Sequence, residues 1–269
     1  MDRELSSLLD PVVTIARKAG DEILKIYESA DFGVETKADH SPLTAADRAS
    51  HEVIVRELAA LTPDIPIMSE ESAAIPYEER SSWSEYWLVD PLDGTKEFIK
   101  RNGEFTVNIA LIRGHDAVLG VVHVPVKDDD YYGCRDHGAF LRRAGGAAEI
   151  IRAHADTAEP VRVVGSRSHR GASLEAFLDR VGPHEMVPMG SSLKLCLVAS
   201  GDADVYPRLG PTSEWDTAAA QAVVECAGGV VVDLEGQPIR YNTRPEVLNP
   251  FFLVYGDTNR DLLGYAAEA

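Results

Sequence analysis

The stretch Tyr86-Trp-Leu-Val-Asp-Pro-Leu-Asp-Gly-Thr-Lys-Glu97 decides the fold of this chain of 269 residues. Its residues 87–89 form a short apolar run between turn-forming residues, which is typical of a buried strand. The strand carries Asp90 at its carboxyl end, and we expect Pro91 to end the pairing because proline has no N–H to donate. A buried strand thus presents a carboxylate at the point where it ends.

A tight turn is predicted at Asp93-Gly94, where glycine can take a positive φ, and Thr95 is placed to cap a short helix over residues 96–99. Asp90 and Asp93 are two carboxylates beside a helix N-terminus, a combination that suits a hard cation and a phosphate. In the alternative interpretation, this is only a strand–turn–helix corner whose carboxylates accept backbone N–H groups. An EF-hand loop fits poorly, because its acidic positions alternate.

The composition limits the possible partners. Hydrophobic residues make up 45% of the chain, as in an ordinary globular protein, and the net charge is −18 with 44 acidic residues. This charge argues against nucleic acid and against an anionic membrane surface as the main partner. The three cysteines, Cys134, Cys196 and Cys226, form no CxxC or Cys/His cluster. We expect their side chains to be buried in the core, and we expect the protein to be in a reducing cytoplasm. No signal-peptide pattern or apolar run of membrane-spanning length is found, so we expect no integral membrane association.

Periodicity predicts a mixed α/β (α+β) class, with sheets covered by helices. Asp10-Pro11 is a strong helix start, and Thr44 with Asp47 resembles a capping box that opens a second helix. An antiparallel meander should follow the central turn, and the second half should alternate strands with helices. We expect helices at 10–29, 44–61, 174–181, 192–200 and 215–227, and strands at 67–68, 104–112, 117–125, 130–134, 139–143, 161–164, 203–206, 229–232 and 251–255.

Three segments are predicted to be surface connections. Residues 72–85 should be an exposed, mobile loop, and residues 128–130 should lie in a solvated hairpin loop. The small and polar residues 144–159 are the best boundary between two lobes, at about 1–150 and 151–269, of a single domain spanning 1–269.

Three further acidic residues lie at the edges of predicted elements, where their side chains can reach a shared cleft. Glu70 follows a short strand, and Asp47 and Asp216 each lie in the first turn of a helix. Asp47 and Asp216 could instead serve only as capping-box acids, and Glu70 could be an exposed loop acid. Chemistry favours the convergence of these acids on one site, because a hard-cation site needs several oxygen ligands and no His/Cys set competes for that role.

Several motifs together identify a family that the chain resembles. The segment 87–95, with Ser69-Glu-Glu71 before it and Glu214-Trp-Asp-Thr-Ala-Ala219 after it, resembles the inositol monophosphatase superfamily of metal-dependent, lithium-sensitive phosphatases. The resemblance is closer still to its CysQ branch, the 3′(2′),5′-bisphosphate nucleotidases, on residues 90–107, 166–169, 190–194 and 206–212. It covers residues 10 to 254, and Ala220 departs from the glycine that is usual in the family. The implied fold is a layered α-β-α-β-α sandwich of the sugar-phosphatase type.

The resemblance also implies a metal site. Five residues would hold two or three Mg²⁺ ions, the last of them through its backbone carbonyl: Glu70, Asp90, Asp93, Asp216 and Leu92. One ion, bound by Glu70, would activate the attacking water, and Asp47 with Thr95 would form a proton-accepting pair for that water. A second ion would neutralise the phosphate and stabilise the leaving oxygen, while the N–H groups of Gly94 and Thr95 hold the phosphate oxygens.

The implied reaction is removal of the 3′-phosphate from adenosine 3′,5′-bisphosphate, giving AMP, with the corresponding step on the sulfated nucleotide also open. In the matching positions, the nucleotide would contact a set of polar residues in the second half: His169, Ser191, Ser192, Lys194 and Arg208. The alternatives are the same chemistry on inositol monophosphate or fructose 1,6-bisphosphate, or an inactive nucleotide- or cation-binding protein. A monomer and a homodimer are both compatible with the sequence, as is loose association with the inner membrane.

Overall fold

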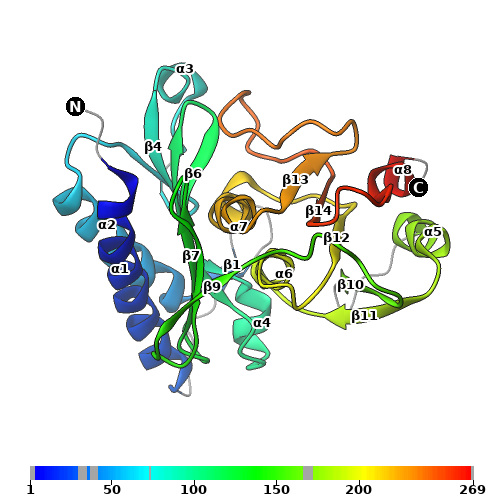
Figure 1. Ribbon diagram of the computed structural model, residues 1–269. Coiled ribbons are helices and arrows are strands. Elements are labelled where there is room, and N and C mark those ends of the chain that lie inside the picture. The colour runs from blue at the N-terminus through cyan, green and yellow to red at the C-terminus, as the bar shows by residue number, and fades with distance from the viewer. Residues whose placement is uncertain (1–3, 30–34, 37–41, 73, 166–171, 268–269) are drawn as a thin grey trace.

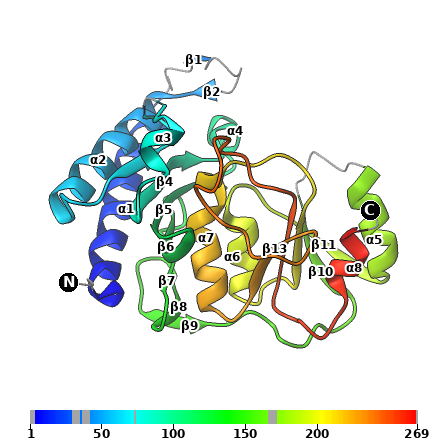
Figure 2. The same ribbon diagram turned by 90° about the horizontal axis from the view of Figure 1, so that it is seen from above.

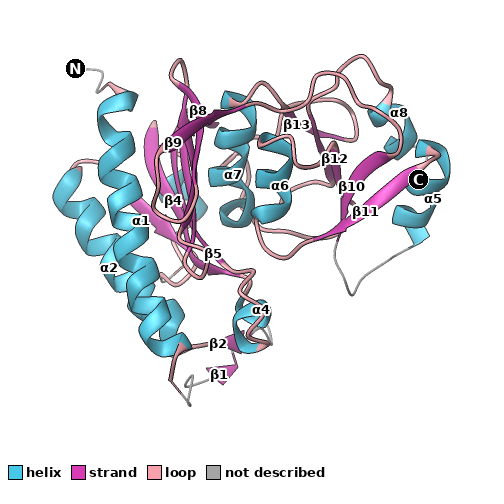
Figure 3. Cartoon of the chain, turned by 60° about the horizontal axis from the view of Figure 1, so that its bottom comes forward, coloured by secondary structure: helices cyan, strands magenta, loops and turns pink. Residues whose placement is uncertain are grey.

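The computed structural model describes residues 4–29, 35–36, 42–72, 74–165 and 172–267. Five layers follow one another across the molecule (Figure 1). Helices α1 (Leu5–Tyr27) and α2 (Ala45–Leu61) form the first layer, and a seven-stranded sheet forms the second. Helices α6 (Leu193–Ala199) and α7 (Glu214–Cys226) lie between this sheet and a five-stranded one, and α5 (Ala172–Val181) and α8 (Leu262–Ala267) cover the outer face (Figure 3). The predicted α-β-α-β-α sandwich is confirmed.

The seven-stranded sheet has its strands in chain order, β3 to β9, as an antiparallel meander in which only β3 and β4 are parallel. Its strands are β3 (Ile67–Ser69), β4 (Glu85–Asp93), β5 (Thr106–Arg113), β6 (Asp116–Val124), β7 (Asp129–Cys134), β8 (Gly138–Arg142) and β9 (Ala148–Ile151). The predicted meander is therefore confirmed. Strand β9 was not predicted, because three of its four residues are exposed at the sheet edge and show no apolar pattern.

The second sheet has the strand order β11-β10-β12-β14-β13 and mixes parallel with antiparallel pairs. Its strands are β10 (Val161–Gly165), β11 (His184–Pro188), β12 (Val205–Arg208), β13 (Val230–Asp233) and β14 (Phe252–Tyr255). Of these, β11 was missed, since this edge strand has no buried residue. A separate pair, β1 (Glu35–Thr36) and β2 (Pro42–Leu43), lies before α2. The first sheet ends at residue 151 and the second begins at residue 161, and the division into two lobes stays an interpretation.

The position of β4, second in the seven-stranded sheet and between two layers of helices, explains why its sequence is a continuous apolar run. Alternate side chains point to opposite faces of a sheet, and both faces are covered here. Leu88 packs in the cluster shared with α7, whereas Trp87 and Val89 pack in the cluster shared with α1 and α2. These side chains are 0–1% exposed. The view from above shows the same order of helices, sheet and helices (Figure 2).

Helix α7 approaches the sheet closely because its buried face carries alanines. A Cβ placed on Gly120 of β6 would lie 2.0 Å from the carbonyl oxygen of Ala219 and 2.9 Å from the Cβ of Ala222. Only glycine leaves room for the helix at this contact. Ala220, where the family usually has glycine, is fully buried in the same helix and is accommodated there.

Helix α1 begins at Leu5 rather than at Asp10, so Pro11 lies inside the helix and the predicted start was wrong. Leu8 and Leu9 are each 4% exposed, and burying their side chains in the core favours the additional helical residues. Pro11 cannot donate to the carbonyl of Ser7, but Ser7 is an exposed residue, where water can satisfy that carbonyl.

Residues 72–85 were expected to be an exposed, mobile loop, and many of the described ones are exposed, but the segment is not all loop. Helix α3 (Tyr77–Arg80) forms within it, and Arg80 is only 2% exposed. The Arg80 guanidinium donates to the side-chain oxygen of Asn242 and to the backbone carbonyl oxygen of Pro245. A buried cation that is hydrogen-bonded to a distant loop fixes this segment on the fold.

A second predicted surface segment, residues 128–130, is only partly solvated. Asp130 lies in β7 and is fully buried, where it accepts from Arg17 of α1 at 2.6 Å and from His123 of β6 at 2.8 Å. Asp128 does remain exposed, beside the same arginine. Three consecutive aspartates look alike in the sequence, and the packing of β7 against α1 and β6 distinguishes Asp130, which contacts Arg17 and His123.

Candidate active site

The site begins at a β-bulge in β4. Asp90 pairs with Asn108 of β5 and Asp93 pairs with Thr106, so the strand resumes its ladder two residues after Pro91 and the predicted end at Pro91 was wrong. The bulge accommodates Pro91 because a bulged residue needs no ladder N–H. The bulge also places two carboxylates within four residues at the carboxyl end of β4. Asp90 is 1% exposed, and Asp93 is half-buried.

The predicted glycine turn is confirmed, with φ of 92° at Gly94, but Thr95 does not cap the helix. Gly94 occupies the N-cap position of α4 (Thr95–Ile99), and Thr95 is its first helical residue. The Thr95 hydroxyl is therefore released from capping. It lies 3.4 Å from Oδ1 of Asp47 and 3.5 Å from the carbonyl oxygen of Leu92, to both of which it can donate.

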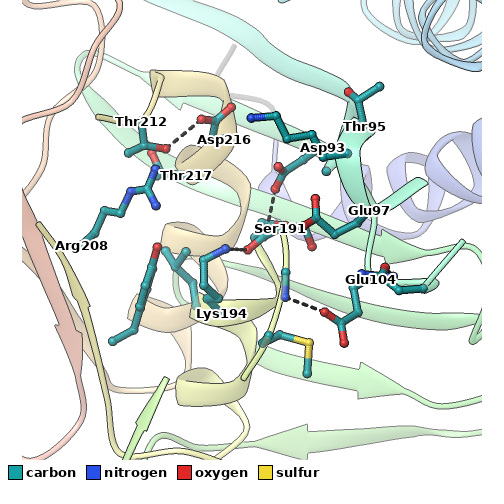
Figure 4. Close-up of a pocket in the computed structure, with 18 of the residues that line it drawn as sticks. Asp93, Thr95, Glu97, Glu104, Ser191, Lys194, Arg208, Thr212, Asp216 and Thr217 are labelled. Carbon is teal, nitrogen blue, oxygen red and sulfur yellow. Dashed lines mark hydrogen bonds between the residues drawn. The ribbon is translucent and has the colours of Figure 1, made fainter. Parts of the chain in front are cut away.

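Carboxylates from three separate elements converge beside this turn. Ligand oxygens of Glu70, Asp90 and Asp216 all lie within 4.8 Å of one another. The end of β3 fixes Glu70, whose N–H donates to the carbonyl of Val89 at 3.1 Å, and the first turn of α7 supplies Asp216. Asp93 lines the cavity next to this cluster together with Asp216 (Figure 4). The predicted metal residues are thus brought together by the fold.

Two of the acids are oriented by capping boxes. Oδ2 of Asp47 accepts from the N–H and the hydroxyl of Thr44 at 2.7 and 2.6 Å. Oδ2 of Asp216 accepts from the N–H of Ser213 at 2.9 Å and from the hydroxyl of Thr212 at 2.7 Å. Each cap uses the Oδ2 atom of its carboxylate. Asp47 and Asp216 can therefore cap their helices and also belong to the site.

Burial and the charges of neighbouring groups raise the pKa values of Asp90, Asp93 and Asp216. Desolvation, followed by the charges of Glu70 and Asp93, raises the pKa of Asp90 well above its usual value. Desolvation and the charge of Asp216 raise the pKa of Asp93 to about 7, and desolvation also raises the pKa of Asp216. The crowded carboxylates of Glu70, Asp90, Asp93 and Asp216 form a donor set of oxygens alone, which fits a hard divalent cation such as Mg²⁺.

Asp93 and Asp216 line a cavity of about 490 Å³ that Lys194 and Arg208 also line (Figure 4). Lys194 donates from Nζ to the carbonyl oxygen of Ser191 at 2.7 Å and lies 5.7 Å from the ring centroid of Tyr206. Arg208 donates to the carbonyl oxygen of Pro211, and its buried Nε has no hydrogen-bond partner among the described residues. A second cavity of about 430 Å³ is lined by Lys194, Tyr206 and Arg208 as well, so the two cations lie between the cavities.

The remaining substrate candidates differ in their surroundings. Ser191 lines the cavity with a φ of 47°, a left-handed conformation that is uncommon for serine. Ser192 is 2% exposed, and its hydroxyl is engaged by Thr106 at 2.8 Å and by Asn108 at 2.9 Å. His169 lies outside the described residues.

Thr106, Asn108 and Glu104 were missed by the sequence reasoning. Thr106 and Asn108 lie on one face of β5 and are 0–1% exposed, whereas their strand neighbours are apolar. Two polar residues at alternate positions of a buried strand are a usable signal for a site. Glu104 shares this spacing just before the strand, and its carboxylate accepts from the N–H of Gly190 at 2.9 Å.

The chain is similar to known proteins in sequence and in fold. The family model described as "Inositol monophosphatase family" matches residues 4–263. The chain is 50% identical over 248 residues, 92% of this chain and 99% of the relative, to the 3′(2′),5′-bisphosphate nucleotidase CysQ of Escherichia coli K12. It is 37% identical over 255 residues, 94% of each chain, to the protein of the same name from Haemophilus influenzae.

Solved structures show the same relationship. The crystal structure of CysQ from Bacteroides thetaiotaomicron has a TM-score of 0.82 at 42% identity and covers 94% of this chain and 97% of its own. An IMPase from Thermotoga maritima has a TM-score of 0.78 at 26% identity and covers 96% of each chain. The family match and the similarity in sequence and fold therefore show that the chain belongs to the inositol monophosphatase family.

Proposed function

We propose that this protein is a Mg²⁺-dependent phosphatase that hydrolyses adenosine 3′,5′-bisphosphate to AMP and phosphate. The observation that carries the proposal is one cavity lined by Asp93 and by Asp216, a member of the carboxylate cluster, together with Lys194 and Arg208. The 50%-identical relative is named for this activity, which supports the assignment. The sulfated analogue of the substrate carries the same 3′-phosphate, and we extend the proposal to it.

The proposed metal residues are Glu70, Asp90, Asp93 and Asp216, with the carbonyl of Leu92, and they would hold two or three Mg²⁺ ions. When bound, Mg²⁺ supplies charge neutralisation of the phosphate and lowers the pKa of a coordinated water. In its absence the acids would repel a phosphate dianion, so we expect the metal-free protein to be inactive.

The protein's own groups would then manage the proton and the phosphate. The Thr95 hydroxyl, already within 3.4 Å of Asp47, would relay the proton of the attacking water to that carboxylate. The water oxygen bonds to phosphorus as the bond from phosphorus to the ribose 3′-oxygen breaks in line, and the departing 3′-oxygen takes a proton from solvent water, without a covalent enzyme intermediate. The N–H groups of Gly94 and Thr95, at the start of α4, would hold phosphate oxygens.

Substrate choice would depend on the two cations between the cavities. A nucleotide with a second phosphate can place that phosphate against Lys194 and Arg208, and a base can extend into the second cavity. Inositol monophosphate has no second phosphate to place there. Ser191, Ser192 and His169 complete the proposed substrate residues, and Ser191 and Ser192 both line the first cavity.

The test is phosphate release in Mg²⁺ from adenosine 3′,5′-bisphosphate, inositol 1-phosphate and fructose 1,6-bisphosphate. We expect a strong preference for the nucleotide. Lys194→Met or Arg208→Gln should lower kcat/KM for the nucleotide by about ten- to a hundredfold and change inositol phosphate turnover far less, because a charged hydrogen bond contributes about 1.5–3 kcal/mol. Lys18→Met, at an exposed ion pair of α1, is the control and should change neither.

The alternatives predict different results. Equal or preferred turnover of a sugar phosphate would keep the metal site but remove Lys194 and Arg208 from substrate binding. Release from none of the three would favour the inactive binding protein. Among the helices of the described residues, none is long and apolar enough to cross a membrane. A cytoplasmic location, with or without loose inner-membrane association, and a monomer or homodimer stay predictions.

A further inference from the structure

The segment 190–192 links the metal residues to the substrate cation. Its Ser192 N–H donates to Oδ2 of Asp93, and its Ser191 carbonyl accepts from Lys194 at 2.7 Å. At its beginning, the Gly190 N–H donates to Oε2 of Glu104 at 2.9 Å. Figure 4 shows these three contacts along one short stretch of backbone between Glu104 and Asp93. A displacement of this segment would therefore alter both sides of the cavity.

Glu104 is an unexpected residue at a site for phosphates. It lines the cavity, is only 8% exposed and would repel an anionic substrate if it faced one. Its observed bond to the Gly190 N–H gives it a different use, since a carboxylate accepts strongly from a backbone N–H. The contact is close, because a Cβ on Gly190 would lie 2.8 Å from Cγ of Glu97 and 3.1 Å from Cβ of Glu104.

The other end of the segment is held as firmly. The Ser192 hydroxyl lies between the side chains of Thr106 and Asn108, and all three residues are at most 2% exposed. Ser191, between the two anchors, has a φ of 47°. A serine in this conformation is strained and persists only where its surroundings fix the backbone. The Glu104 contact is one of the two anchors that do so.

We propose that Glu104 is a positioning residue of the active site: its carboxylate, through the Gly190 N–H, holds segment 190–192 so that the Ser191 carbonyl orients Lys194 and the Ser192 N–H orients Asp93. The inference rests on the proposed function for the substrate role of Lys194. Its effect on Asp93 does not depend on which phosphate ester is hydrolysed.

The experiment compares Glu104→Ala, Glu104→Gln and Gly190→Ala with wild type. Gln keeps an oxygen that can accept from Gly190, whereas the added methyl of Gly190→Ala pushes the segment away while Glu104 stays intact. Asp257→Ala is the matched control. Asp257 is 6% exposed and accepts from the backbone N–H of Thr157 at 2.9 Å, but it lines neither cavity. Two readouts are taken: KM and kcat on the phosphate ester that wild type hydrolyses fastest, and calorimetric titration with Mg²⁺ alone.

We expect Glu104→Ala and Gly190→Ala each to raise KM by about tenfold, more than they lower kcat, and to weaken Mg²⁺ binding several-fold. Glu104→Gln should stay within about threefold of wild type. The double variant Glu104→Ala/Gly190→Ala should be little worse than either single one, because both remove the same contact. Asp257→Ala should lower thermal stability and leave KM and Mg²⁺ binding unchanged.

Unchanged KM and Mg²⁺ binding in folded Glu104→Ala and Gly190→Ala would overturn the proposal, as would a Gln variant as impaired as the Ala variant. If Glu104→Ala does not fold, Gly190→Ala and Glu104→Gln decide the matter. If wild type hydrolyses no phosphate ester tested, the proposed function fails by itself, and the Mg²⁺ titration still tests the role of Glu104.

Discussion

Asp90 combines full burial with the most crowded electrostatic surroundings in the site, and it gives the most direct single-residue prediction. Asp90→Asn keeps the shape but removes a charge that neighbouring carboxylates repel. Phosphate release should fall at least about a hundredfold, since even partners outside the metal's own ligands are worth 10–100-fold. The metal-free variant should unfold at a higher temperature than metal-free wild type, as calorimetry in EDTA can measure. Wild-type activity would remove Asp90 from the metal site, with Asp116→Asn on the surface as the control.

The thiols give a prediction about pH. Desolvation raises the pKa of the Cys134 thiol to about 11 and that of the Cys226 thiol to about 12, and it also raises the pKa of Cys196. A raised pKa keeps a thiol protonated, and only the thiolate is a good nucleophile. Iodoacetamide at about pH 8 should therefore modify all three slowly in the folded protein and quickly in urea. Cys134 and Cys196 are buried, as expected, whereas Cys226 is only partly buried. Rapid labelling of Cys134 or Cys196 in the native protein, followed by mass spectrometry, would contradict their burial.

Among the elements, the contact of β6 with α7 sets the spacing of the central layers. Gly120→Ala places a methyl group against the carbonyl of Ala219, so the helix or the strand must move. We expect a loss of about 1–3 kcal/mol in the free energy of unfolding, measured in urea. Gly210→Ala is the matched control, since a Cβ there has no neighbour within 4 Å among the described residues and should have little effect. A stable Gly120→Ala variant would mean that the layers can separate without loss.

In the whole molecule, we expect Mg²⁺ to stabilise the folded state. Its proposed donors come from the residue after β3, from β4 and from α7, which are separate in the sequence and come together only in the fold. A cation that binds only the folded state stabilises it by about 2.7 kcal/mol at one hundred times its Kd. The melting temperature should thus rise with Mg²⁺ and fall in EDTA, and Asp90→Asn should lose most of the rise. Na⁺ at equal ionic strength is the control. An equal rise in Na⁺ would point to general screening of the acidic surface.

The elements that carry their own local signal could be predicted from the sequence. The capping box of Thr44 and Asp47 fixed the start of α2 at the residue observed. The apolar run at 87–89 identified β4, and the glycine turn at 94 was found with its positive φ. Edge strands β9 and β11 escaped because strands at an edge are held by backbone pairing and need no buried side chains.

Local sequence therefore determined which residues carry the chemistry: carboxylates at element ends, beside a proline-containing bulge and a glycine turn. Tertiary structure alone decided which of their oxygens face one another. It brought Glu70, Asp90 and Asp216 together, buried Asp130 rather than Asp128, and joined Glu104 to Gly190. The physical reason is that periodicity and capping act within a few residues, whereas convergence depends on layers packed by apolar burial across the whole chain.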